Sequence, residues 1–212
     1  MPDPVRPNLI YVLAGVNGAG KSSVLGEDLV HRGGTFFNPD EETRVLLAAN
    51  PGMSHADANA TAWNIGTARL REAIDAGHDY NFETTLGGST ITRMLEEALA
   101  LGQQVFMSYV GLDSMERHIA RVRARVAAGG HDIPVQRIRE RYHSSRLNLV
   151  RLVPQLTRLH VWDNSAEADP LTGRRPRPAL VLETTGGRIT AGVPPREVPQ
   201  WAKPIVAAAL RR

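Results

Sequence analysis

The stretch LIYVLAGVNGAGKSS, residues 9–23, decides the fold class of this chain. Residues 9–14 form a short apolar run, which predicts a buried strand. The run leads directly into Gly15-x-x-x-x-Gly20-Lys21-Ser22, which fits the P-loop pattern, and residues 21–31 are predicted to form a helix. Strand, glycine loop and helix therefore follow one another in the order that a phosphate-binding loop requires.

The residue types in this loop suit the binding of a nucleotide. Glycine lets consecutive backbone N–H groups surround phosphate oxygens, and the following helix directs its positive end at the same anion. Lys21 is expected to reach the β- and γ-phosphates, and the Ser22 hydroxyl is expected to be a magnesium ligand. We therefore predict a site for ATP and Mg²⁺. The predicted ATP-binding residues are Gly15, Asn17, Gly18, Ala19, Gly20, Lys21, Ser22 and Ser23.

The bulk composition excludes several other classes of protein. The chain has 212 residues, 42% of them hydrophobic and 22% charged, which is ordinary for a globular domain. It contains no cysteine, which excludes a disulfide framework and a cysteine-ligated zinc site. A net charge of +3 does not favour nucleic acid as a partner. With no signal-peptide pattern and no apolar run of membrane-spanning length, we expect a soluble, cytoplasmic protein without a membrane partner.

Predicted strands and helices alternate over most of the chain. The predicted strands after the P-loop are 35–38, 79–83, 104–110 and 159–162, and the predicted helices are 41–49, 54–76, 89–101, 114–128 and one that begins after Pro134. Residues 179–183 and 188–191 flank a hairpin turn, and a last helix is predicted over about 198–211. This order predicts an α/β fold of the three-layer P-loop NTPase or kinase type, with a mostly parallel central sheet and a small C-terminal β-hairpin plus helix.

A series of shorter motifs resembles a known family. It comprises Phe-Phe-Asn-Pro-Asp-Glu at 36–41, Asn-Phe-Glu-Thr-Thr-Leu at 81–86, Val-Gly-Leu-Asp-Ser at 110–114 and the arginine-rich segment 121–134. Together with the P-loop, these resemble the zeta toxin family of P-loop kinases, in particular its short members, over about residues 8–163.

This resemblance implies a kinase that resembles nucleotide-monophosphate kinases in its core. The best-known family members use ATP to phosphorylate the 3′-hydroxyl of the amino sugar of UDP-N-acetylglucosamine, so a small-molecule acceptor of that kind is expected. An antitoxin, where the family has one, is a separate small helical protein. We expect residues 1–165 to form the kinase domain and residues 166–212 to add a linker, a β-hairpin and a helix to it.

Asp40 occupies the place of the family's catalytic aspartate, after the second strand. A sugar hydroxyl is a poor nucleophile until a carboxylate takes its proton, so the resemblance implies that Asp40 is the general base. The residues alone allow another interpretation, in which Asn38 or Asp40 caps the helix predicted over 41–49. The two roles are compatible.

Glu83 and Thr85 end the third predicted strand. The carboxyl ends of parallel strands face the ligand crevice, and the resemblance implies that these two residues hold the acceptor's sugar and phosphates. The alternative is an ordinary strand end that enters a turn at Gly87-Gly88. The long helix 54–76 is expected to shape the acceptor pocket.

Arginines at 117, 121 and 125 recur every four residues and are expected to share one face of a helix. Phosphoryl transfer needs cations near the γ-phosphoryl oxygens. The family uses two arginines in this region, and Arg121 or Arg125 fits the first of them. A solvated basic helix face is the alternative.

The family's second arginine lies in a turn where this chain has Gly129-Gly130-His131. That departure leaves the second cation open between His131 and Arg141. The predicted catalytic residues are therefore Asp40, Lys21, Arg121 and Arg125; the predicted substrate-binding residues are Glu83, Thr85, His131 and Arg141; and the predicted metal ligand is Ser22.

Two further residue types have less specific interpretations. Asp113 follows a strand, where a Walker-B aspartate would lie, but it precedes Ser114, and we favour helix capping there. Trp63 and Trp162 are predicted to be core or interface residues rather than stacking platforms.

Three functions remain consistent with these residues. The first is a small-molecule kinase acting on UDP-N-acetylglucosamine or a related nucleotide sugar, and the second is a kinase acting on another hydroxyl, such as a nucleotide ribose. The third is a P-loop ATPase without transfer. The sequence lacks an ABC-type signature, and it has no lysine between Lys21 and Lys203 for a GTPase base-reading motif.

Overall fold

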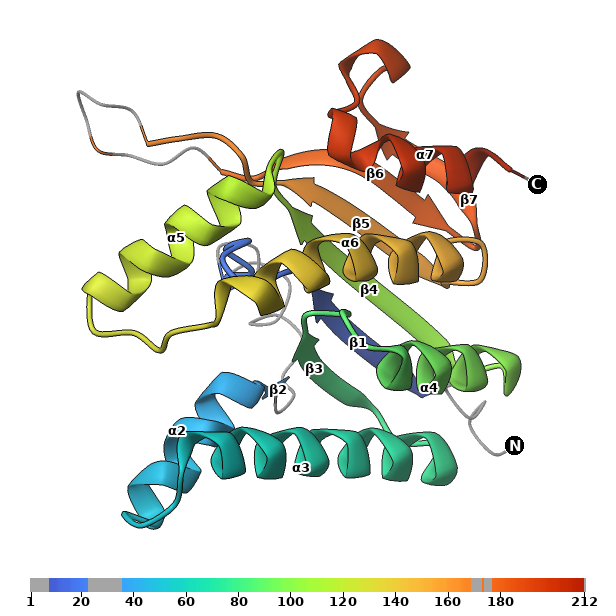
Figure 1. Cartoon of the computed structure of the whole chain (residues 1–212). Coiled ribbons are helices and arrows are strands. Elements are labelled where there is room, and N and C mark those ends of the chain that lie inside the picture. The colour runs from blue at the N-terminus through green and yellow to red at the C-terminus, as the bar shows by residue number, and fades with distance from the viewer. Residues whose placement is uncertain (1–7, 23–35, 169–172, 174–176, 212) are drawn as a thin grey trace.

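A seven-stranded sheet in the order β2-β3-β1-β4-β5-β6-β7 forms the centre of the molecule (Figure 1). The structure is a computed structural model that describes residues 8–22, 36–168, 173 and 177–211. The strands are β1 Leu9–Ala14, β2 Phe36–Phe37, β3 Tyr80–Thr84, β4 Gln104–Gly111, β5 Arg158–Asp163, β6 Ala179–Thr185 and β7 Arg188–Gly192. The strands from β2 to β5 pair in parallel, and β6 and β7 pair antiparallel. The predicted α/β fold with a mostly parallel sheet is confirmed.

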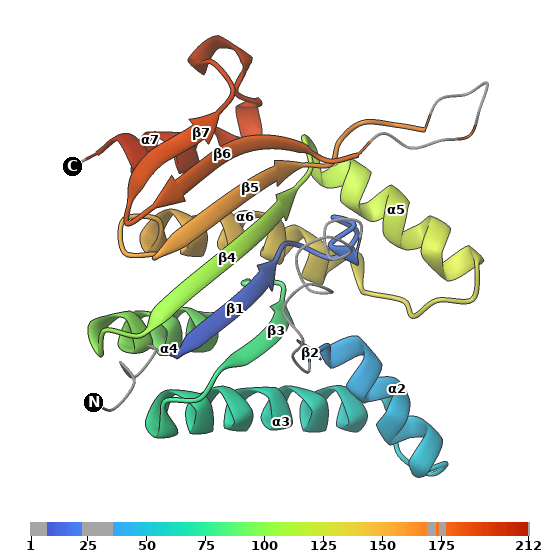
Figure 2. The same cartoon turned by 180° about the vertical axis from the view of Figure 1, so that it is seen from behind.

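The helices pack along one face and one edge of this sheet. They are α2 Pro39–Ala49, α3 His55–Ala76, α4 Ser89–Ala100, α5 Met115–Ala127, α6 Val135–Leu152 and α7 Lys203–Leu210, with 3₁₀ turns η1 Pro195–Glu197 and η2 Gln200–Ala202. Figures 1 and 2 show α4, α6 and α7 on the same face of the sheet, and α3 along its β2–β3 edge. Most of the helix predicted over 21–31 lies outside the described residues.

The central strand β1 explains why the P-loop lies at the edge of the sheet where the strands end. All of its residues are buried, as expected for an apolar strand with neighbours on both sides. It pairs with β3 and β4, so their carboxyl ends lie beside its own. Gly15 follows at φ 147°, and a Cβ at this position would lie 2.4 Å from the Val110 carbonyl oxygen. Only glycine fits this close approach of the loop to β4.

Local capping signals set the ends of the helices around the site. Ser54 caps α3 by accepting from the Asp57 N–H at 3.1 Å, and Gly77 ends that helix with φ 67°. Helix α2 begins at Pro39 rather than at 41, because Asn38 is its N-cap and proline suits the first helical position. The predicted helix boundary was therefore late by two residues.

The C-terminal hairpin and helix pack against the main sheet. Strand β6 extends the sheet beside β5, and Trp201 is 3% exposed. Its ring lies so close to Gly111 that a Cβ there would come within 2.3 Å of it. Trp201 also packs against Tyr109, with ring centroids 6.3 Å apart. The C-terminal segment therefore supports the end of β4, next to the P-loop.

None of the helices in the described part of the chain is both long and apolar enough to cross a membrane.

Candidate active site

The P-loop is held in shape by buried polar contacts with three other elements. The Gly15 N–H donates to the Thr84 carbonyl at 3.2 Å. His118 Nδ1 lies 2.9 Å from the Asn17 carbonyl oxygen, and Asn164 Nδ2 donates to the Ala19 carbonyl at 2.8 Å. The loop thus has a fixed conformation set by β3, α5 and the segment after β5.

His118 and Asn164 were not predicted as site residues, and each is only 1% exposed. Asn164 directly follows β5, and polar residues at the carboxyl ends of parallel strands often serve the site. His118 occupies an apolar position on α5, four residues before buried Val122. Both signals were present in the sequence, but each is weak without the fold.

Burial keeps His118 neutral. It lowers the pKa of the imidazole to about 4, and the nearby charges of Lys21 and Arg121 act in the same direction. The ring therefore carries one proton at neutral pH, and the hydrogen bond to the Asn17 carbonyl places it on Nδ1.

Lys21 lies inside the loop with two partners. Its Nζ donates to the Gly15 carbonyl at 2.7 Å and lies 3.3 Å from Glu83 Oε1. Glu83 is held by Asn38 as well, whose Nδ2 donates to Oε2 at 3.3 Å. Ser22, the predicted metal ligand, is exposed at the end of the loop, and Ser23 lies outside the described residues.

A cleft of about 730 Å³ opens beside the loop, between α2 and α3 on one side and the β3–α4 turn and the α5–α6 connection on the other. It has the volume of an ordinary small-molecule site. Six of the predicted site residues line it, namely Asn17, Asp40, Glu83, Thr85, His131 and Arg141. The long helix α3 lines the cleft from Ala56 to Thr67.

Asp40 lies in the first turn of α2 with its carboxylate free of capping. The cap is Asn38, whose Oδ1 accepts from the N–H groups of Asp40 at 2.9 Å and Glu41 at 3.3 Å. The Asp40 side chain is 50% exposed, and its Oδ2 lies 3.8 Å from Arg125 Nη1. The carboxylate is therefore available to a molecule in the cleft.

Arg141 connects the cleft with the P-loop. Its Nη1 donates to Asn17 Oδ1 at 2.7 Å. The side chain passes over Gly87, where a Cβ would lie 2.7 Å from Arg141 Cγ. Burial lowers the pKa of Arg141, but an arginine stays charged at neutral pH. Arg141 is therefore a partly buried cation that lies between the cleft and the P-loop.

His131 has a different environment. Its ring stacks on His55 with centroids 4.8 Å apart and planes 10° apart, and its carbonyl accepts from Arg125 Nη2 at 3.1 Å. Of the two candidates for the second cation, the described contacts join Arg141, rather than His131, to the P-loop.

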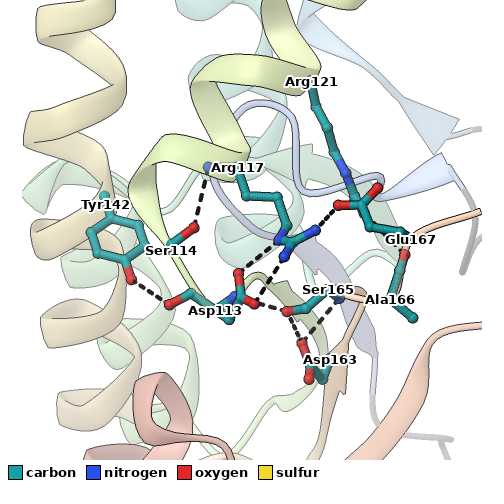
Figure 3. A network of polar contacts seen from close by, with 9 residues as sticks. All are labelled: Asp113, Ser114, Arg117, Arg121, Tyr142, Asp163, Ser165, Ala166 and Glu167. Atoms are coloured by element: carbon teal, nitrogen blue, oxygen red, sulfur yellow. Dashed lines mark hydrogen bonds and ion pairs between the residues drawn. The ribbon is translucent and has the colours of Figure 1, made fainter.

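Arg117, Arg121 and Arg125 of α5 have three separate sets of partners, and Figure 3 shows those of Arg117 and Arg121. Arg117 pairs with Asp113, with Nε 2.8 Å from Oδ1, and with Glu167. Arg121 Nη2 donates to the Ala166 carbonyl at 3.4 Å, whereas Arg125 faces Asp40. Arg121 therefore lies at the segment after β5, and Arg125 lies beside Asp40, which lines the cleft.

The predicted capping at the start of α5 is seen in the same network (Figure 3). Ser114 is the N-cap and accepts from the Arg117 N–H at 3.2 Å, while the Asp113 carboxylate pairs with the Arg117 side chain.

Trp63 is not a core residue. It is 50% exposed and lines the cleft, so of the two predicted places, core or interface, the core is excluded. Trp162 is partly buried on β5.

Comparison with known proteins gives similarity in both sequence and structure. No protein-family model matches the sequence. An uncharacterized protein of Haemophilus influenzae is 28% identical over 140 residues, which cover 65% of this chain and 95% of that protein.

Several solved structures share the fold. The AvrRxo1-ORF1:-ORF2 complex with ATP has a TM-score of 0.65 at 15% identity, covering 89% of this chain and 61% of that chain. The same complex with sulphate ions has a TM-score of 0.63 at 15% identity, covering 89% and 62%. A structure from the PezAT chromosomal toxin–antitoxin system of Streptococcus pneumoniae has a TM-score of 0.56 at 14% identity, covering 85% and 73%.

The chain therefore shares the α/β P-loop fold of these structures. It spans about three fifths of the length of the AvrRxo1-ORF1 chains that it matches. This fold places the loop, the cleft and Asp40 at one edge of the sheet, and the side chains around that edge determine what the site can do.

Proposed function

We propose that the protein is an ATP-dependent kinase that phosphorylates a hydroxyl group of a small molecule. The observation that carries this proposal is the shared cleft beside the P-loop, which brings the Asp40 carboxylate, Glu83 and Arg141 together. An ATPase without transfer has no need of such a cleft with an exposed carboxylate next to its phosphate loop.

ATP is the proposed donor, with Mg²⁺. The loop glycines at 15, 18 and 20 have positive φ, which leaves the backbone open to phosphate oxygens. Lys21 lies in this loop, and Ser22 would hold the metal, which when bound neutralises phosphate charge. Arg121 lies next to the segment after β5 and is proposed to contribute a cation there. The ATP-bound structure of AvrRxo1-ORF1:-ORF2, which shares the fold, is consistent with this donor.

In the proposed reaction, the acceptor hydroxyl oxygen attacks the γ-phosphorus. The new oxygen–phosphorus bond forms as the bond from the γ-phosphorus to the bridging oxygen breaks, and ADP leaves. Asp40 takes the hydroxyl proton, for which its carboxylate is suitably exposed to the cleft. Lys21, Arg125 and Arg141 offset the charge on the transferred phosphoryl group.

The leading acceptor is UDP-N-acetylglucosamine or a related nucleotide sugar. A cleft of about 730 Å³ has room for such a molecule. Glu83 can accept hydrogen bonds from sugar hydroxyls, and Thr85 can donate one to a phosphate oxygen. His131 lies on the cleft wall and is proposed to contact the acceptor.

Three wider proposals follow. Residues 166–212 belong to the same domain as residues 1–165, which is supported by the pairing of β5 with β6. A separate antitoxin is a candidate partner, because the PezAT protein of the same fold comes from a toxin–antitoxin system. The cytoplasm is the proposed location, because ATP is abundant there.

The proposal is tested by a transfer assay. Purified protein is incubated with γ-labelled ATP, Mg²⁺ and a panel of nucleotide sugars, nucleotides and simple sugars, and products are identified by mass spectrometry. We expect a phosphorylated acceptor with the wild type and none with Lys21→Ala. ADP formation that is the same with and without every acceptor would show an ATPase instead.

A further inference from the structure

The α3 wall of the cleft has a feature that phosphoryl transfer does not require. Trp63 lines the cleft and is 50% exposed. Among the exposed large apolar side chains of the described residues, Trp63 is the only one on this wall or anywhere else in the cleft. An indole offers a wide flat surface, and leaving half of it in water has a free-energy cost that a ligand can remove.

The neighbours of Trp63 on α3 leave its ring accessible. Residues three or four positions away lie on the same helix face, and here they are Asn59, Ala60, Gly66 and Thr67. None is large or charged, and all four line the cleft. A flat ligand can therefore approach the indole without a helix neighbour in its way.

Close packing fixes the position of α3 relative to the sheet. At Gly66 a Cβ would lie 2.5 Å from the Phe37 ring, so α3 lies directly against β2 one turn after Trp63. The helix is also capped at both ends, by Ser54 and Gly77. Trp63 is thus presented by a rigid element, which limits the entropy lost when a ligand binds.

The charged residues of the cleft come from other elements. Asp40 comes from α2, Glu83 from β3, and Arg137, Glu140 and Arg141 from α6, whereas the α3 residues that line the cleft carry no charge. The polar groups suit hydroxyls and phosphates, and the α3 wall suits an uncharged ring.

We propose that Trp63 is the platform on which the nucleobase of the acceptor stacks. This inference rests on the proposed function and names the part of the acceptor that α3 recognises. The phosphates and the reacting sugar then lie toward the charged residues, and the base lies on the indole. A sugar phosphate without a base lacks this contact and binds more weakly.

The experiment measures acceptor binding without turnover. A non-hydrolysable ATP analogue at saturating concentration fills the donor site, so that a second nucleotide reports on the cleft. Calorimetric titrations then use UDP-N-acetylglucosamine, the four nucleoside monophosphates and N-acetylglucosamine 1-phosphate. The proteins are the wild type, Trp63→Ala, Trp63→Phe and the control Leu147→Ala, which removes an exposed side chain outside the cleft.

We expect at least one base-bearing ligand to bind the wild type more tightly than the sugar phosphate. Trp63→Ala should weaken that ligand by about 5-fold to 150-fold, the effect of losing one base–aromatic stack. Trp63→Phe should retain most of the affinity, and Leu147→Ala should match the wild type. Binding of the ATP analogue should be equal in all four proteins, which reports that each is folded.

Two results would overturn the inference: equal affinity of base-bearing ligands for wild type and Trp63→Ala, or no preference of the wild type for them over the sugar phosphate. Either would assign Trp63 to another use, such as contact with a protein. Failure of the proposed function is separate, because it shows as a lack of transfer in the labelled-ATP assay while the binding titrations can still be read.

Discussion

Lys21 and Glu83 form an ion pair at the centre of the site, with Nζ 3.3 Å from Oε1 and the two side chains 8% and 16% exposed. Lys21 lies in the loop that follows β1, and Glu83 lies on the neighbouring strand β3, in register with Leu13 of β1. Glu83, proposed to hold the acceptor substrate, and Lys21, proposed to hold the phosphates of ATP, are therefore in direct contact, so changes at either one should affect both substrates.

Lys21→Ala should remove phosphoryl transfer while the protein stays folded. Its ammonium group offsets charge that develops between the β- and γ-phosphates, and alanine cannot replace it. Product formation and thermal melting should be measured on the same preparation. Turnover near that of the wild type in a folded variant would exclude the P-loop from the mechanism.

Glu83→Gln should distinguish the effect of the ion pair on ATP binding from its effect on the acceptor substrate. Removing the carboxylate charge frees Lys21 and removes repulsion of the triphosphate, so the ATP analogue should bind tighter by about 1 kcal/mol. The phosphoryl-acceptor substrate loses one of the two carboxylate oxygens that can accept its hydrogen bonds. The kcat/KM for that substrate should therefore fall by the equivalent of about 1–3 kcal/mol. Glu41→Gln, an exposed glutamate on α2 that pairs with Arg44, is the control. Unchanged values for both ligands would contradict the role of the pair.

Asp40→Asn should lower kcat by roughly 10²–10⁴-fold, the range for losing a general base. ATP binding should change little, because the Asp40 carboxylate lies near Arg125, whereas Lys21 of the loop pairs with Glu83. Glu42→Gln removes a carboxylate two residues further along α2 that is outside the cleft, and it should behave like the wild type. Weakened ATP affinity with an intact kcat would instead make Asp40 part of the metal shell or of the structure.

Arg141→Ala should lower kcat by roughly 10²–10³-fold, the cost of losing one preorganised group that stabilises transition-state charge. Arg137→Ala is a matched control one turn earlier on α6, because Arg137 also lines the cleft but is 67% exposed and faces Glu140. Steady-state kinetics of both variants should show the large loss only for Arg141. Equal losses would point to a general effect of positive charge in the cleft.

The neutral state of His118 predicts a pH dependence of stability. Its folded-state pKa is about 4, against an ordinary value of 6.5, so between these values the unfolded chain binds the proton and the native protein does not. The contribution of neutral His118 to the free energy of unfolding is fully present above about pH 6.5. It is lost as the pH falls toward 4, by about 3 kcal/mol in total.

Urea unfolding of the wild type and of His118→Asn at pH 7.5 and pH 5 measures this contribution. Asparagine keeps a donor near the Asn17 carbonyl but does not titrate. The free energy of unfolding should therefore fall less in the variant between the two pH values. The same fall in both proteins would mean that other groups account for the pH dependence.

The features that could be predicted from the sequence are those that depend on neighbouring residues. An apolar run followed by Gly15 to Ser22 is recognisable because strand, loop and helix are contiguous, and the caps Ser54 and Gly77 act within one turn of α3. Alternation of strands and helices then fixed the α/β class. The same alternation indicated that Asp40 follows the second strand and that Glu83 lies at the end of the third. Residues in these positions meet at one edge of a parallel sheet.

Which side chains meet across that edge depends on how distant parts of the chain pack together. Arg141 and Asn17 are 124 residues apart in the chain, and Asn164 and Ala19 are 145 apart, so no local pattern encodes either contact. The strand order brings them together, and the room left by Gly87 decides that Arg141 reaches the loop. Exposure of Trp63 was equally hidden, because a tryptophan at a helical spacing has the same pattern whether that face of the helix meets the core or a cleft.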